Sequence, residues 1–178
     1  NQDTTGHEVD RLEIARIADR SEAVHFMARG VLIPGQEVAV MDTMAAHCRK
    51  PLYVAAVTDA GLDRAEELYR QRGRMTIQFS IINSPLNVIP AMIPPFLKCL
   101  RKGLPVYVST MPMAGLSAPY SMSGLLTLTH AEALFGITLA QLVNPGIMTV
   151  HAGLPAMANA DNPDSRPPDY EPRCCRGV

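Results

Sequence analysis

Short β-type segments that alternate with longer segments of helical pattern constrain the fold of this chain more than any other feature. Strands are predicted at residues 24–28, 52–57, 76–82, 105–109 and 147–151. Helices are predicted at residues 9–20, 38–48, 62–72, 95–103 and 123–143. Residues 106–109 carry no charge, which is typical of a strand covered on both faces. The alternation predicts βαβ units in an all-parallel sheet with right-handed crossovers.

Length and motifs narrow the choice among parallel folds. A complete (β/α)8 TIM barrel has eight strands and takes about 250 residues, whereas this chain has 178 residues. Neither a G-x-G-x-x-G pattern nor a Walker pattern occurs, which argues against a nucleotide-binding doubly wound sheet. We therefore predict an α/β fold, an incomplete TIM barrel with about five parallel strands and flanking helices, with a smaller doubly wound domain as the alternative. Residues 8–160 would form this partial barrel, residues 1–7 a polar lead-in and residues 161–178 a disordered, proline-rich tail.

Charge and composition exclude several classes of partner. The net charge of −1 argues against nucleic acid and against a polybasic membrane surface. No run of eighteen apolar residues occurs, and the first residues lack the pattern of a signal peptide, so a cytoplasmic protein that does not span a membrane is predicted. The four cysteines have no C-x-x-C spacing, and no metal site is predicted.

The segment after the fourth predicted strand is the main candidate for a functional site. A β-to-α connection usually takes about 2–6 residues, but residues 110–120 form a longer stretch of small and turn-forming residues. Loops at the C-terminal ends of parallel strands carry the chemistry of barrel enzymes, so these residues are expected on one rim together with Asp59. No catalytic residue is identified. The predicted substrate-binding residues are Asn83, Ser84, Met111, Pro112, Met113, Ala114, Gly115, Ser117, Tyr120 and His151.

Two acidic residues are given structural roles. Thr129 and Glu132 have the spacing of a capping box, which predicts that Glu132 helps to begin a helix. Asp59 follows the second predicted strand and is expected to cap the helix that contains Gly61.

Several dispersed motifs, taken in order, resemble the trimethylamine methyltransferase family over roughly residues 20–162. They are the Ser84-Pro85-Leu86 turn and residues 109–119, followed by residues 130–134, residues 140–146 and the sequence His151-Ala152-Gly153. The resemblance is closer to the branch without pyrrolysine, which includes glycine betaine methyltransferases. It implies a TIM barrel that moves a methyl group from a small methylamine to the cobalt of a corrinoid (cobalamin) carried by a separate partner protein. No cofactor would be bound directly, and a homo-oligomer stays open. Family members are much longer, so the chain resembles a section of one.

The resemblance and the chemistry together favour a quaternary amine. Such an amine already carries the charge that makes it a good leaving group, whereas a tertiary amine needs activation. The protein would mainly position the substrate, and aromatic faces hold choline-like cations. Tyr120, Tyr53 or Phe79 would provide such a face, while Gly115 and Ala118 would leave room for the corrinoid.

Two other hypotheses stay open. One is a different TIM-barrel enzyme, such as a lyase or an aldolase, with His151 or Asp59 as acid or base. No lysine ends a predicted strand, which counts against a Schiff-base mechanism. The other is a non-catalytic fragment, because an open sheet leaves an unpaired edge that favours association.

Overall fold

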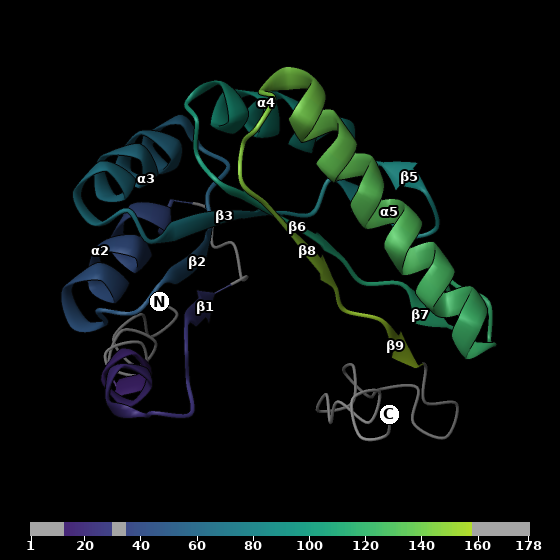
Figure 1. The fold of residues 1–178 in the computed structure, drawn as a ribbon, viewed down its shortest axis with the longest axis horizontal. Coiled ribbons are helices and arrows are strands. Elements are labelled where there is room, and N and C mark those ends of the chain that lie inside the picture. The colour runs from purple at the N-terminus through teal and green to yellow at the C-terminus, as the bar shows by residue number, and fades with distance from the viewer. Residues whose placement is uncertain (1–12, 30–34, 158–178) are drawn as a thin grey trace, which may run out of the picture.

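Five parallel strands in chain order form the curved sheet that organises the molecule (Figure 1). The computed structural model describes residues 13–29 and 35–157; the predicted lead-in and tail lie outside these ranges. The strands are β1 (Met27–Arg29), β2 (Leu52–Ala55), β3 (Met75–Phe79), β6 (Val106–Thr110) and β8 (Thr149–Gly153). Each pairs in parallel with its neighbour. The predicted incomplete TIM barrel is therefore confirmed.

The helices cover the convex face of this sheet (Figure 1). Residues 13–20 are helical, and they are followed by α2 (Glu37–His47), α3 (Asp59–Arg72), the short 3-10 helix η1 (Pro90–Met92), α4 (Ile93–Arg101) and α5 (Met122–Val143). Helix α3 ends as predicted at Gly73, whose φ of 64° suits a glycine. Helix α4 begins two residues earlier than predicted. Pro94 and Pro95 fit in its first turn, where a backbone N–H has no helical partner.

Several strand boundaries differ from the prediction, and turns near the strands account for three of these differences. The Lys50 ammonium donates hydrogen bonds to the backbone carbonyls of Ser21 and Val24, so β1 begins only at Met27. The Gln141 side chain donates to the Ile147 carbonyl at 2.8 Å, which delays β8 to Thr149.

The third difference is a small hairpin after β3. Strand β3 ends at Phe79, and β4 (Ile82–Asn83) then pairs antiparallel with β5 (Asn87–Val88). This pairing lies in the loop that follows β3, so the five principal strands remain parallel as predicted.

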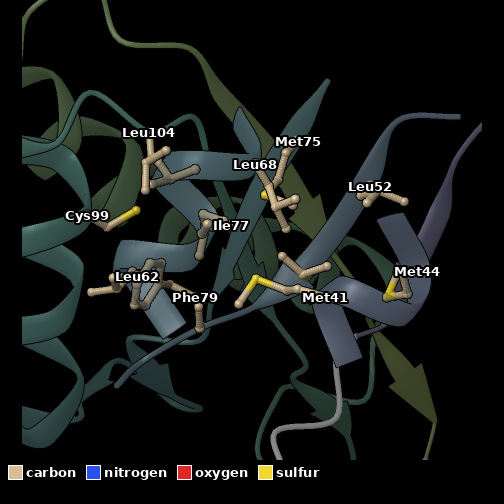
Figure 2. Close-up of a cluster of buried hydrophobic side chains, with 14 of the residues drawn as sticks. Met41, Met44, Leu52, Leu62, Leu68, Met75, Ile77, Phe79, Cys99 and Leu104 are labelled. Carbon is tan, nitrogen blue, oxygen red and sulfur yellow. The ribbon is translucent and has the colours of Figure 1, made fainter. Parts of the chain in front are cut away.

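The hydrophobic core fills the space between the sheet and the helices (Figure 2). Ile77 and Phe79 of β3 pack towards Leu62 of α3 and Met41 of α2, and all four side chains are nearly or fully buried. Burying a side chain of this size contributes about 1.5–3 kcal/mol. The same burial raises the pKa of the Cys99 thiol to about 12, so this cysteine is an inert part of the core.

The concave face of the sheet carries a row of aromatic rings. Tyr53 alternates with the buried Leu52 and Val54, so its side chain points away from the helices. Its ring lies 4.7 Å from that of Phe26 and 5.5 Å from that of Tyr107, between ring centroids. Burial, and to a smaller extent the neighbouring Tyr53, raise the pKa of Tyr107. In a complete barrel such inward-facing side chains fill the interior.

Helix α5 is the one helix among the described residues that is long and apolar enough to cross a membrane by length and composition. It packs as a layer of the barrel against β6 and β8. Gly136 allows a close approach to the sheet, because a Cβ atom there would lie 2.7 Å from a methyl group of Val108.

Candidate functional site

The loops predicted to carry the site leave the same end of the sheet. Asp59 follows β2, Asn83 and Ser84 follow β3, and residues 111–120 follow β6. Because these strands are parallel, their C-terminal ends share one side of the barrel. His151 is different, since it lies in the middle of β8 and pairs with Val108 rather than ending the strand.

One turn of helix α5 contacts all three segments that carry predicted site residues. The Thr110 hydroxyl, at the end of β6, donates a hydrogen bond to the backbone carbonyl of Thr129 at 3.5 Å. His130 contacts His151 of β8, with 3.0 Å between Nδ1 and Nε2. Glu132 reaches the turn after β3. This turn of α5 therefore ties the bases of the candidate loops together from the helical side of the sheet.

Glu132 does not belong to a capping box, and that prediction was wrong. Helix α5 begins at Met122 with Ser121 as its cap, so Thr129 and Glu132 lie well inside it. The Thr129 hydroxyl instead donates to the Leu125 carbonyl at 2.7 Å. Glu132 is fully buried, and its two carboxyl oxygens accept hydrogen bonds from the Ser84 hydroxyl at 2.8 Å and the Leu86 amide at 3.0 Å. Spacing along the helix could not reveal partners from a distant segment.

The turn that Glu132 holds has an unusual backbone. The Ser84–Pro85 peptide bond is cis, and Leu86 has a φ of 51°. The turn leaves Asn83 exposed and Ser84 half-buried. Ser84 is thus engaged by Glu132, whereas Asn83 is available on the surface at the C-terminal end of β3.

The long loop after β6 is more ordered than a simple connector. Its strand β7 (Met113–Ala114) pairs with β9 (Ala156–Met157). The Met113 amide donates to the Ser117 hydroxyl at 2.9 Å, and the Met113 carbonyl accepts from the amides of residues 116–118. Gly115 has a φ of 80°, which the tight turn requires.

These contacts divide the predicted residues of the loop into two groups. Pro112 and Ala114 are buried, whereas Met113, which is half-buried, and Ser117 serve the loop's own hydrogen bonding. Met111, Gly115 and Tyr120 are exposed, and the tyrosine ring lies against Gly115. The exposed group is therefore the part of the loop that can meet a ligand.

The aromatic residues proposed as a cation-binding surface have three different positions. Phe79 is buried on the helical side and packs against Phe96 with 5.2 Å between ring centroids, so that candidate is excluded. Tyr53 lies on the concave face but near the start of its strand, away from the C-terminal rim. Tyr120 is 74% exposed at the rim. Sequence reasoning missed Tyr107 and Phe26, although the alternation along β6 could have indicated Tyr107.

Charged groups are nearly absent from this region. Between Gly103 and Ala160, Glu132 is the only Asp, Glu, Lys or Arg in the sequence. The predicted capping role of Asp59 was wrong, because the Thr58 side chain caps α3 and accepts from the Gly61 amide. Asp59 instead forms an ion pair with Lys98 of α4 at 2.7 Å. Neither Asp59 nor His151 is free to act as an acid or base towards the concave side, which weakens the lyase and aldolase hypothesis.

A broad groove of about 540 Å³ lies at the opposite end of the barrel, around the residues that precede β1, β2 and β3. Arg20, Arg49, Lys50 and Arg74 are among its lining residues. Asp19 binds Arg49 in this groove, and hydrogen bonds from the Arg49 amide and side chain lower the pKa of that carboxyl group. The groove is therefore separate from the candidate site. Within the described ranges, no group of three or more His, Cys, Asp or Glu residues could hold a metal ion.

Comparison with known proteins gives a consistent set of matches. Residues 53–159 match the trimethylamine methyltransferase (MTTB) family. A glycine betaine methyltransferase from Desulfitobacterium hafniense is 32% identical over 108 residues, which is 60% of this chain and 21% of that protein. The trimethylamine methyltransferase MttB1 from Methanosarcina mazei is 44% identical over 63 residues, which is 35% of this chain and 13% of that protein. The chain thus spans about a fifth of the first relative and a smaller share of the second.

Proposed function

Because this chain belongs to the trimethylamine methyltransferase family, we propose that the whole protein moves a methyl group from a quaternary methylamine of the glycine betaine class to the cobalt of a corrinoid on a separate protein. The family match covers more than half of the chain. The similarity to the glycine betaine enzyme extends over 108 residues, against 63 for the trimethylamine enzyme. The longer match favours the quaternary substrate.

The observation that carries this proposal is the uncharged surface at the C-terminal ends of β3 and β6. Asn83, Met111 and Tyr120 are exposed there, and the single carboxyl group nearby, that of Glu132, uses both oxygens to hold the Ser84–Leu86 turn. A quaternary ammonium group needs no proton transfer before its methyl group leaves. A surface without a free acid or base can therefore serve it by binding and orientation alone.

Two kinds of group on this surface suit such a cation. The face of Tyr120 can attract a quaternary ammonium, a contact that contributes about 0.5–2 kcal/mol. The Asn83 amide can donate a hydrogen bond to a carboxylate of the betaine type. A reduced corrinoid supplies the nucleophile when its protein docks. Gly115 and Leu116, both exposed at the tip of the loop, would be the first residues that it meets.

The test uses the full-length protein that contains this chain, its corrinoid protein and a reductant, with cobalt methylation followed by visible absorption. We expect turnover with glycine betaine or a related quaternary amine, and little turnover with trimethylamine. Turnover with trimethylamine alone would contradict the quaternary assignment. A lack of methyl transfer from every quaternary and tertiary amine would contradict the proposed reaction itself.

Variants of the loop test the role of Tyr120. Tyr120→Ala should lower kcat/KM by about 2- to 30-fold, the range that corresponds to one cation–π contact. Tyr120→Phe should keep most of the activity, because the ring face remains. Leu142→Ala is the control, since it removes an exposed apolar side chain at the far end of α5, away from the loop. Equal activity of Tyr120→Ala and the unchanged protein would remove this residue from the site.

A further inference from the structure

His130 and His151 form a pair of imidazole rings that the proposed methyl transfer does not use. The Nδ1 atom of His130 lies 3.0 Å from Nε2 of His151, and the ring centroids are 5.1 Å apart. Both side chains are exposed. They come from α5 and β8, two regular elements that pack directly against each other, and not from loops.

The packing around the pair fixes the distance between the two backbones. A Cβ atom at Gly153 would lie 2.2 Å from the Thr129 methyl group, so only glycine lets β8 approach α5 so closely. Thr129 and Gly153 are near neighbours in sequence of His130 and His151. His151 points to this side because it pairs with Val108, which also faces α5 at Gly136. The pair is therefore held together by the fold on the helical side of the sheet.

We propose that His130 and His151 form a binding site for a divalent late transition-metal ion of the Ni²⁺ or Cu²⁺ type. Imidazole nitrogens bind such ions at about 2.0–2.1 Å. Two nitrogens on one ion are then about 2.9 Å apart when the N–metal–N angle is a right angle, and about 3.3 Å apart when that angle is tetrahedral. The separation of 3.0 Å is close to the right-angled value. Right angles are typical of square-planar and octahedral coordination, which Cu²⁺ and Ni²⁺ prefer.

The surroundings define what else the ion would bind. Glu132, the nearest carboxyl group in the sequence, is engaged with Ser84 and Leu86 and does not join the pair. In the described part of the chain no third His, Cys, Asp or Glu completes a cluster with them. The remaining positions of the ion would hold water or a small ligand. Without metal, the two rings can share an N–H···N hydrogen bond.

A bound ion would tie β8 to α5, the helix that contacts the bases of the candidate loops after β3 and β6. Because the ion binds the folded protein, it raises stability by RT ln(1 + [metal]/Kd). The hard ion Mg²⁺, which prefers oxygen ligands, should have no such effect. This site does not depend on the proposed methyl transfer, so either can fail without the other.

The test is a titration of the 178-residue chain with NiCl2 and CuCl2 by calorimetry, together with electron paramagnetic resonance of the Cu²⁺ form. The background carries Cys174→Ser and Cys175→Ser, which removes two adjacent thiols that could compete for metal. We expect one ion per chain and a Cu²⁺ spectrum with coupling to imidazole nitrogens. His130→Gln and His151→Gln should each weaken binding at least tenfold.

His25→Gln is the matched control, since His25 is also exposed but lies at the opposite end of the barrel. It should leave binding unchanged. The melting temperature should rise with Ni²⁺ in the background protein and in His25→Gln, but not in the two other variants. Circular dichroism checks that each variant is folded. Binding that survives both His130→Gln and His151→Gln, or that is lost equally in His25→Gln, would overturn the proposal.

Discussion

Glu132 shows how one helical residue can hold a distant turn of the candidate site in place. It is a fully buried acidic residue in a region almost without charge, and both oxygens accept hydrogen bonds from the turn after β3. Burial of such a group is unfavourable unless its partners are present. The same contacts therefore stabilise the fold and fix the position of Asn83 beside the turn.

Removal of the Glu132 side chain should be costly, and its conservative replacement should not. Glu132→Ala leaves a cavity and removes the acceptor of the Ser84 hydroxyl and of the Leu86 amide, so we expect a loss of about 3 kcal/mol in the free energy of unfolding. Glu132→Gln should cost much less, because its amide can donate to the Ser84 hydroxyl while its oxygen accepts from the Leu86 amide. Urea denaturation measures both. A Gln variant as unstable as the Ala variant would show that the hydrogen bonds are not what matters.

Lys102 provides a test of pH dependence. Hydrogen bonds from its ammonium group lower the pKa of Asp63 and of Glu66, and these two carboxylates raise the pKa of Lys102. The carboxylates contribute stability above their unfolded pKa values, about 4, and lose it as the pH falls through their lower folded values. The contribution of Lys102 is complete below its unfolded pKa, about 10.4, and is lost as the pH rises through its higher folded value.

We therefore expect Lys102→Gln to be less stable than the unchanged protein near pH 7 and the difference to shrink on acidification below about pH 4. Urea denaturation at several pH values measures this difference. Arg101→Gln, at the exposed last residue of α4 and next to Lys102, is the control and should show no such trend. A difference that is constant from neutral to acidic pH would contradict the assignment.

At this scale the sequence predicted the right segments better than the right contacts. The Ser84-Pro85-Leu86 turn and the His130–Leu134 region were both recognised, but their connection spans 48 residues. Nothing in local spacing shows that a helical carboxyl group meets a turn so far away. The sequence also did not show to which side of the sheet the His151 side chain points, because this depends on the pairing of His151 with Val108. Whether the exposed rim residues bind substrate stays a prediction.

Among the elements, α5 packs against β6 through a close contact at Gly136. Gly136 faces Val108, a buried β-branched residue whose side chain has little freedom to move. Alanine at this position gains helix propensity but must displace a methyl group that would lie 2.7 Å away. Overpacking of this kind outweighs the gain in propensity.

We expect Gly136→Ala to lower the free energy of unfolding by about 1–2 kcal/mol. In a Val108→Ala background the same change should cost less or become favourable, because the space is then open. Thr138→Ala, on the exposed side of α5, should be neutral or stabilising. Thermal denaturation of the unchanged protein, the two single variants and the double variant measures the coupling. Identical costs of Gly136→Ala in both backgrounds would show that its contact with Val108 does not limit the packing of α5.

Element types were predicted more accurately than element ends. Composition alone identified β2 and β6 as short apolar runs and α5 as a long apolar segment. Strands β1 and β8 begin later than predicted, because the side chains of Lys50 and Gln141 donate hydrogen bonds to carbonyls in the turns before them. Such contacts between a side chain and a backbone carbonyl of another segment leave no periodic signal in the sequence.

At the scale of the whole molecule, the exposed side of α5 has no charged residue. Leu126, Leu134, Phe135 and Leu142 are all exposed on it. Strand β8 has β6 as its one partner among the described strands of this sheet, so it presents a free edge beside that helix. An apolar face next to an open strand edge favours association between molecules.

We therefore expect the 178-residue chain to self-associate in a concentration-dependent way. Leu134→Lys combined with Leu142→Lys should increase the monomer fraction, because two charges are then placed on the apolar side of α5. Gln71→Lys, at an exposed position of α3, adds charge elsewhere and is the control. Light scattering during gel filtration measures the mass. A chain that stays monomeric at all concentrations would contradict this expectation.

The order of the strands has a consequence for how the protein is made. The sheet order β1-β2-β3-β6-β8 repeats the order in which the strands occur in the chain. Each new strand can therefore dock on the one synthesised just before it, without waiting for a distant segment. This order keeps the sequence separation between paired strands smaller than a crossed strand order would, which favours faster folding than that alternative. The growing sheet can be built one strand at a time as the chain leaves the ribosome, from its N-terminal side onwards.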